Sequence, residues 1–310
     1  MKPLVSILIP CRNEEDYIGN CLWSLDNQDY PNIEIIIVDG MSDDNTINEI
    51  ASLHIKAKTY FNPKKTMPYA VNKGIRHATG EFIMICGAHS TYPTNYVSEC
   101  IKTLILTGAD NAGGVYVTPD NNQFTVALTS KFGVGKDRRS SGPCKFVDTV
   151  FGGCYRREVF EEIGLFNTEL THTQDLEFNY RLRQSGGKIV CNDYIISRWY
   201  PRQKTWKAFA KKAFIDGQWV ILPVLYCKTP ITLRHLVPLV FVITLPLSIW
   251  PYMVLNLINS RKWRRWYLLS MAYFTLHVFY GAGSAWACLK VIKEWMKRAL
   301  SKAMLPGVAY

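Results

Sequence analysis

Residues 33–46 read Ile-Glu-Ile-Ile-Ile-Val-Asp-Gly-Met-Ser-Asp-Asp-Asn-Thr, an apolar run that ends at an aspartate and a polar loop. Residues 4–10 and 81–86 are similar apolar runs, and helical spacing marks the intervening segments 14–25, 43–53 and 69–77. Short, fully apolar strands that alternate with helices are typical of a parallel sheet covered on both faces. The sequence therefore predicts an α/β fold.

The loops that follow these strands form the candidate site. Ligands of parallel α/β sheets bind beyond the carboxyl ends of the strands, which here are residues 10–15, 39–44 and 87–90. Asp39, directly after a buried strand, is placed to accept a hydrogen bond from a base or ribose. The simpler interpretation of Asp43 and Asp44 is that they cap a helix. Neither a Gly-x-Gly-x-x-Gly nor a Walker motif is present, which disfavours a dinucleotide site and a P-loop.

Charge is divided unevenly along the chain, whose formal net charge is +11. Residues 1–197 hold 19 Lys/Arg and 23 Asp/Glu, whereas residues 198–310 hold 17 Lys/Arg and only Asp216 and Glu294. Such an excess of positive charge indicates nucleic acid or a membrane surface as the partner. Because the basic part is also the apolar part, the sequence favours membrane lipids and predicts no nucleic-acid partner.

The nine cysteines are scattered, and no Cys-x-x-Cys occurs. Their odd number and their spacing argue against a disulfide framework and against a zinc site. We therefore expect the main domain to lie in a reducing cytoplasm.

Six motifs follow one another in a characteristic order between residues 5 and 202. They are Val-Ser-Ile-Leu-Ile-Pro-Cys-Arg-Asn-Glu-Glu (5–15), Ile-Ile-Val-Asp-Gly-Met-Ser-Asp-Asp-Asn-Thr (36–46), Ala-Val-Asn-Lys-Gly-Ile-Arg-His-Ala-Thr-Gly-Glu (70–81), Val-Asp-Thr-Val-Phe-Gly-Gly-Cys-Tyr-Arg-Arg-Glu-Val-Phe (147–160), Gln-Asp-Leu-Glu-Phe-Asn-Tyr-Arg-Leu-Arg (174–183) and Trp-Tyr-Pro-Arg (199–202). This set resembles the family 2 glycosyltransferases with the GT-A fold, and within them the ExoA-like branch of succinoglycan biosynthesis. The resemblance implies a Rossmann-like, mostly parallel sheet flanked by helices.

The resemblance also implies roles for individual residues. The nucleotide and the donor sugar are expected to contact the first loop, the aspartate after the second strand, the helix that follows and the third loop: Pro10, Arg12, Glu14, Asp39, Asn72, Gly74 and Ala88. Asp39 would read the base, which in this family is usually uracil.

A divalent metal, Mn²⁺ or Mg²⁺, is the cofactor that the resemblance implies. The family's usual motif after the third strand is Asp-x-Asp or Asp-x-His, and here the residues are Gly87-Ala88-His89. His89 occupies a ligand position, but Gly87 removes the first carboxylate, and these metals favour oxygen ligands. A metal held mainly by the diphosphate is the alternative. Arg138 and Arg139 are candidates for a phosphate clamp, with a solvated loop as the alternative.

Asp175 matches the catalytic base of the family. It lies at the start of an amphipathic helix within 171–184, where a carboxylate is otherwise a common cap. As a base, it would take the proton of the acceptor hydroxyl on the face opposite the leaving group, which inverts the anomeric configuration.

The C-terminal third follows a membrane pattern. Residues 204–219 place apolar side chains at helical spacing opposite four lysines, as in an interfacial helix. Residues 236–258 and 266–289 carry no charge and are long enough to span a bilayer, although prolines and the sequence Gly281-Ala282-Gly283 interrupt them. The basic link between them conflicts with the positive-inside rule if both span, so spanning and re-entrant segments stay open.

We expect three regions: a GT-A catalytic domain at 1–197, an amphipathic interfacial region at 198–230, and hydrophobic membrane segments with a basic tail at 231–310. The resemblance implies an inverting transfer from a nucleotide sugar, expected to be a UDP-sugar, to a lipid-linked saccharide in surface polysaccharide synthesis. Transfer to polyprenyl phosphate and a non-catalytic membrane scaffold are the alternatives. The expected location is the bacterial inner membrane, with the catalytic domain facing the cytoplasm.

Overall fold

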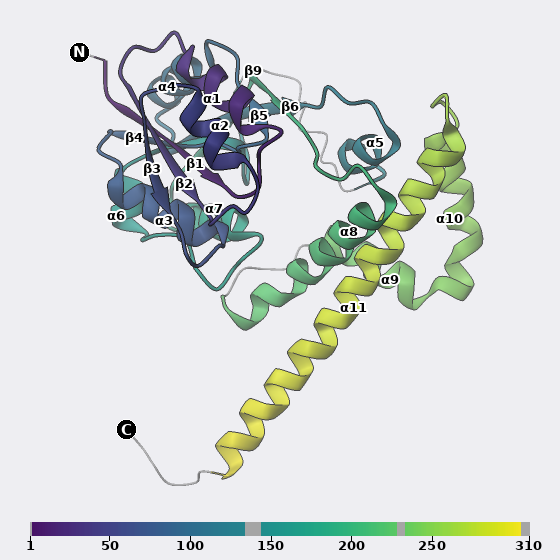
Figure 1. Cartoon of the computed structure of the whole chain (residues 1–310). Coiled ribbons are helices and arrows are strands. Elements are labelled where there is room, and N and C mark those ends of the chain that lie inside the picture. Colours follow the sequence, from purple (N-terminus) through teal and green to yellow (C-terminus); the bar gives the residue numbers. More distant parts are fainter. Residues whose placement is uncertain (1, 134–143, 228–232, 305–310) are drawn as a thin grey trace. The chain divides into compact units, whose positions relative to one another are not determined.

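The computed structural model describes residues 2–133, 144–227 and 233–304 (Figure 1). These residues form two compact units. The sheet unit comprises 2–120 and 144–201, and the helical unit comprises 121–133, 202–227 and 233–304. The predicted boundary at 197 lies close to the observed one at 201, but the sequence did not indicate that residues 121–133 belong to the second unit.

A mixed nine-stranded sheet forms the sheet unit, in the order β3-β2-β1-β4-β8-β6-β9-β5, with β7 paired to β9. Strands β3 to β4 on this path are parallel, as predicted, whereas β8 runs antiparallel to both β4 and β6. The prediction of a mostly parallel sheet is therefore correct for only one half. The strands are β1 (Val5–Cys11), β2 (Ile33–Asp39), β3 (Ala57–Phe61), β4 (Phe82–Ile85), β5 (Ser90–Thr91), β6 (Asn111–Val117), β7 (Lys145–Phe146), β8 (Phe151–Arg156) and β9 (Ile189–Trp199).

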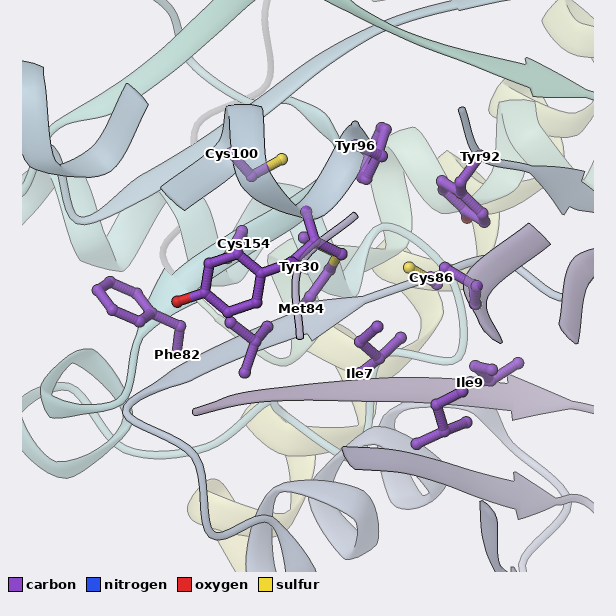
Figure 2. Close-up of a cluster of buried hydrophobic side chains, with 14 of the residues drawn as sticks. Ile7, Ile9, Tyr30, Phe82, Met84, Cys86, Tyr92, Tyr96, Cys100 and Cys154 are labelled. Atoms are coloured by element: carbon purple, nitrogen blue, oxygen red, sulfur yellow. The ribbon is translucent and has the colours of Figure 1, made fainter. Parts of the chain in front are cut away.

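Helices cover both faces of this sheet. Helices α1 (Ile18–Asp26) and α4 (Tyr96–Thr107) pack on one face, and α3 (Met67–His77), α6 (Glu158–Glu162) and α7 (Gln174–Gln184) pack on the other. Figure 2 shows the first face, where Ile7, Ile9 and Met84 meet Tyr96 and Cys100. Strand β1 sends alternate side chains to opposite faces and both are buried, which explains its unbroken apolar sequence.

Element boundaries differ from the prediction where loops carry the site. Strand β1 continues one residue past Pro10, because Cys11 still pairs with Asp39 of β2. Helix α1 begins four residues later than predicted, since residues 12–17 form a loop in which Asn13 has φ +54°. Helix α2 (Thr46–Ser52) likewise begins after the polar loop rather than inside it.

In the helical unit, α8 (Trp206–Ile221) buries its apolar face against α11 (Trp266–Met304). The two backbones approach closely, since a Cβ at Gly217 would lie 2.0 Å from the Tyr280 carbonyl oxygen and one at Gly283 2.1 Å from that of Phe214. Ser284 Oγ donates to the Gly217 carbonyl at 2.9 Å. Packing on α11 accounts for the apolar face of α8, and contact of residues 204–219 with a membrane interface stays a prediction.

The two predicted membrane segments also differ in the structure. Residues 236–258 divide into α9 (Leu233–Ile243) and α10 (Leu245–Ser260), which meet at Thr244 just before Pro246. Residues 266–289 lie inside the single helix α11, which passes through Gly281 and Gly283 without a break. Both glycines instead allow the backbone of a neighbouring helix to approach closely. Among the residues described, no helix combines the length and the apolar character that crossing a membrane requires.

Candidate functional site

The first and second loops, residues 11–15 and 39–46, are joined by hydrogen bonds at the carboxyl ends of β1 and β2. Asn13 N donates to Ser42 Oγ at 2.9 Å, and its side chain exchanges two hydrogen bonds with Asp43. Glu14 N donates to Thr46 Oγ1 at 2.7 Å. The two loops therefore form one rigid platform at the edge where a ligand of this fold would bind.

Asp39 is 1% exposed and braces the second loop. Its carboxylate accepts hydrogen bonds from both the backbone N, at 2.9 Å, and the hydroxyl of Ser42. Cys11 Sγ approaches Oδ1 at 3.9 Å as a weak third donor, and a carboxylate has about four acceptor positions, so capacity for a ligand remains. Contact between Asp39 and a base stays a prediction, whereas its role in shaping the loop is observed.

Asp44 performs the capping role that the sequence suggested for it. Its Oδ1 accepts from the backbone N of Thr46 at 3.0 Å and from the hydroxyl of Thr46 at 2.6 Å, at the start of α2. Partial burial opposes ionisation, but these hydrogen bonds outweigh it, and the pKa of Asp44 is lowered.

The other first-loop residues have different environments. Pro10 is half-buried and pairs with Val38, Arg12 is exposed, and Glu14 is buried. Glu14 Oε1 lies 3.1 Å from His89 Nδ1. This contact connects the first loop to the third, which follows β4.

The third loop does not supply a complete metal site. His89 uses Nδ1 toward Glu14, Gly87 has no side chain, and the methyl group of Ala88 is buried in the core. Among the described residues, no three His, Cys, Asp or Glu side chains cluster as metal ligands. One imidazole and one carboxylate do not match the oxygen-rich set that Mg²⁺ or Mn²⁺ prefers. The described residues therefore do not fit a metal held by the protein alone.

Asn72 and Gly74 of α3 have packing roles. The Asn72 amide donates to the Phe166 carbonyl at 2.8 Å and accepts from the Phe166 backbone N at 3.0 Å. A Cβ at Gly74 would lie 3.2 Å from a methyl group of Leu8, so glycine lets α3 approach β1. Their predicted contact with the donor remains a prediction. Arg138 and Arg139 lie outside the described residues.

Asp175 is exposed in the first turn of α7. The preceding Gln174 donates to Met67 Sδ at 3.0 Å, which ties this turn to the start of α3, at the carboxyl edge of the sheet. Burial and, after it, the charge of Asp175 raise the pKa of Tyr155 on β8. The contact of Gln174 with Met67 therefore places the first turn of α7 near the edge of the sheet where the three loops also lie.

Two polar networks that the sequence reasoning missed hold α7 in place. Glu177 pairs with Arg181 at 2.6 and 3.0 Å, and Arg181 also donates to the carbonyl groups of Ile163 and Leu165. One turn after Asp175, the buried Asn179 donates to Thr149, and it accepts from Asn111 at 3.2 Å and from Tyr155 at 3.1 Å. The i,i+4 spacing of Glu177 and Arg181 was a visible signal. The partners of Asn179 are distant in the sequence, so the sequence carried no signal of that network.

Comparison with known proteins identifies the class. Residues 6–164 match the family described as Glycosyl transferase family 2. This match covers half of the chain, and the chain belongs to that family. It is a glycosyltransferase, as the motifs predicted.

Two relatives cover most of the chain. A dolichyl N-acetyl-alpha-D-glucosaminyl phosphate 3-beta-D-2,3-diacetamido-2,3-dideoxy-beta-D-glucuronosyltransferase of Methanococcus voltae is 34% identical over 69% of this chain and 71% of its own. The succinoglycan biosynthesis protein ExoA of Rhizobium meliloti is 27% identical over 79% of this chain and 81% of its own.

Solved structures share the fold. A mannosyltransferase of Pyrobaculum calidifontis, in complex with GDP-Man and Mn²⁺, superposes with a TM-score of 0.66 at 17% identity, covering 92% of this chain and 88% of that one. S. aureus TarS with UDP-GlcNAc superposes with a TM-score of 0.55 at 14% identity, over 91% of this chain and 90% of that one. These similarities establish the GT-A fold.

Proposed function

We propose that this glycosyltransferase moves a sugar from a nucleoside diphosphate donor to a lipid-linked saccharide with inversion at the anomeric carbon. The observation that carries the proposal is the placement of an exposed carboxylate, Asp175, at the same sheet edge as the joined loops 11–15 and 39–46. The loops would hold the nucleotide, and Asp175 would face the acceptor.

The chemistry needs a base and a positive charge. The acceptor hydroxyl loses its proton as it attacks, and Asp175 is the base we assign. The donor leaves through an oxocarbenium-like state while negative charge grows on the departing diphosphate. Arg12, exposed in the first loop, is the described cation that we assign to meet that charge. No step is assigned to a metal, because the ligands present do not form a site for one.

Substrate classes follow from the relatives. The Methanococcus voltae enzyme is named for a dolichyl-linked sugar phosphate as its acceptor, and the Rhizobium meliloti protein for succinoglycan synthesis. We therefore propose a lipid-linked saccharide as the acceptor here. UDP- and GDP-sugars are the two donor classes to test, because they occur in the neighbouring structures.

Incubating the full chain with a panel of UDP- and GDP-sugars and a bacterial lipid extract tests the reaction. A lipid-linked product that is one sugar longer supports the proposal. A sugar attached directly to a polyprenyl monophosphate would favour the alternative acceptor. Absence of both nucleotide release and lipid product across the panel would contradict the proposed glycosyl transfer. Repeating the assay with a chelator and with added Mn²⁺ measures metal dependence.

Membrane attachment is a second part of the proposal and rests on the helical unit. Large apolar side chains are exposed on α9 and α10, among them Leu233 and Leu247 at 84% and Trp250 at 79%. Exposed apolar side chains gathered on neighbouring helices mark a protein–protein or a membrane contact site. We propose that it contacts the membrane, with the sheet unit on the cytoplasmic side of a bacterial inner membrane.

The last turns of α11 are a further candidate for an interfacial element. Ile292, Trp295, Met296 and Leu300 are exposed at the spacing of one helix face. The remaining surface of these turns is basic, with the cations Lys290, Lys293, Lys297 and Arg298. Its single acidic residue, Glu294, pairs with Lys297. Apolar contact plus positive charge fits an anionic lipid surface.

Flotation of the full chain with vesicles of phosphatidylglycerol and phosphatidylcholine tests this attachment. Replacing Trp295 and Leu300 with Ser should weaken binding, whereas Leu106→Ser, on the exposed surface of α4, is the matched control. Binding that is equal with and without phosphatidylglycerol would contradict the electrostatic contribution. Full-length protein that does not float at all would contradict membrane attachment.

A further inference from the structure

Aromatic rings form a continuous row along the carboxyl edge of the sheet, from the end of the first loop into the mixed half of the sheet. Consecutive ring centroids are 4.9 to 6.5 Å apart, within or close to the range of favourable aromatic contact. The row runs from Tyr200 to Tyr17, His89, Trp199, Tyr116 and Phe151.

These rings come from five separate parts of the chain. Tyr17 immediately precedes α1, His89 lies in the third loop, and Trp199 ends β9. The sheet brings them together, since Ser90 pairs with Trp199 and the Tyr200 N donates to the His89 carbonyl at 3.0 Å. Their positions in the sequence gave no sign of this arrangement.

A second aromatic cluster in the same unit shows what a purely structural cluster looks like. Tyr155, Phe160, Phe166 and Phe178 pack with centroids 4.2 to 6.3 Å apart, and each is at most 6% exposed. Every ring of the row is instead only half-buried, and none belongs to the two core clusters that cover the sheet faces. The rings of the row therefore keep surface that the core does not use.

Half-buried aromatic rings with polar groups at their edges suit a carbohydrate. One face of a pyranose presents C–H groups that pack on an aromatic ring, while its hydroxyls need donors and acceptors at the margin. The row offers tyrosine hydroxyls and the indole N–H of Trp199 in addition to its ring faces. We propose that this row binds the pyranose rings of the saccharide acceptor, a proposal that rests on the glycosyltransferase function proposed above.

The position of the row separates it from the nucleotide. Loops 11–15 and 39–46 follow β1 and β2 in the parallel half of the sheet. Tyr116, Phe151 and Trp199 belong to β6, β8 and β9 in the mixed half. His89, after β4, lies where the two halves meet. A saccharide on Tyr116, Phe151 and Trp199 would thus lie beside the donor rather than in its place.

Saturation-transfer NMR on the full chain tests the proposal, with methyl β-D-glucopyranoside and the methyl β-glycoside of N-acetylglucosamine as probes. Saturating the aromatic protons should transfer signal to the C–H protons of the pyranoses. Trp199→Leu and Tyr116→Leu should each reduce that signal by about fivefold or more, the scale of an aromatic contact. Trp199→Phe, which keeps a ring, should retain most of it. Tyr194→Leu, 70% exposed on the same strand but outside the row, is the control.

Calorimetry with UDP and GDP on the same samples tests nucleotide binding separately from saccharide binding to the row. Nucleotide binding with no saccharide signal, or with a signal unchanged in Trp199→Leu and Tyr116→Leu, overturns the assignment of the row and leaves the proposed function intact. Failure of the parent protein to bind either nucleotide overturns the proposed function and the row with it. Loss of the saccharide signal with unchanged nucleotide affinity supports the row, because a misfolded variant would lose both.

Discussion

Glu14 and His89 are 75 positions apart in the sequence, yet Glu14 Oε1 lies 3.1 Å from His89 Nδ1. Each residue follows a strand, β1 or β4, and these strands are parallel neighbours. The buried carboxylate and the half-buried imidazole therefore hold together the loops on either side of the expected ligand. The contact involves Nδ1 of His89 alone, the kind of carboxylate contact that orients a histidine whose other ring nitrogen binds a ligand.

Loss of the imidazole should destabilise the sheet unit. His89→Ala removes a hydrogen-bond partner of the buried Glu14, and we expect the free energy of unfolding to fall by about 1–3 kcal/mol. Urea denaturation measures this. His54→Asn is the control, because His54 is exposed and asparagine accepts its positive φ. Equal stability of His89→Ala and the parent would show that the contact contributes little.

Asp39 can be tested for base contact separately from its role in the loop. Asp39→Ala removes both, whereas Ser42→Ala keeps the carboxylate and removes the hydroxyl that donates to Asp39 and accepts from Asn13 N. If Asp39 contacts the nucleotide, Asp39→Ala should weaken nucleoside diphosphate binding by about 1.5–3 kcal/mol and Ser42→Ala by much less. Calorimetry gives both values. Equal losses would mean that Asp39 acts only by shaping the loop.

Gly87 offers a gain-of-function test of the missing metal ligand. A Cβ there would lie 3.5 Å from Ser90 Oγ and 3.9 Å from the Tyr92 hydroxyl, which is ordinary contact, so Gly87→Asp should fold. The added carboxylate, two residues before His89, should tighten Mn²⁺ binding in the presence of nucleoside diphosphate by about tenfold or more. Titration of Mn²⁺ with Gly87→Asn as the control measures the change. An unchanged affinity would show that this loop cannot direct a carboxylate to a metal.

Acid should destabilise the sheet through Glu34 of β2. Burial opposes its ionisation, but hydrogen bonds from Thr79, Ser6 and Lys58 outweigh it and lower its pKa to about 2. A lowered folded-state pKa contributes stability above the unfolded value of about 4.3, and that stability is lost as the pH falls toward 2. Glu34→Gln should therefore cost about 1–2 kcal/mol at pH 7 and only about a quarter of that at pH 2.5. A cost that does not change with pH would contradict this.

Much of the parallel half of the fold was predictable, because β1, β2 and β4 are buried on both sides and read as unbroken apolar runs. Strand β3 was missed because it lies at the sheet edge and carries Lys58 and Thr59 exposed. Strand β6 has two glycines, Gly113 and Gly114, where any side chain would meet neighbouring backbone, so its sequence lacks the apolar pattern of a strand. The glycines of α8 and α11 likewise became packing sites rather than breaks.

The parts of the site that lie in loops directly after strands were predictable from the sequence. Motif order located the loops around Asp39 and His89 and the helix of Asp175, and the structure places them at one edge. Sequence could not show that Asn72 is bonded to the backbone of Phe166, 94 residues away, or that Trp199 meets Tyr116. Such contacts depend on how distant segments pack, which local patterns do not contain.

The most direct test of the account is the rate of glycosyl transfer by Asp175→Asn. Asparagine keeps the shape and much of the capping capacity of Asp175 but cannot accept the proton of the acceptor hydroxyl. With the donor found in the nucleotide-sugar panel, we predict a fall in transfer of about 10²–10⁴-fold, with donor affinity and the thermal unfolding midpoint close to those of the parent. Transfer by Asp175→Asn at more than a tenth of the parent rate would contradict the assignment of Asp175 as the base.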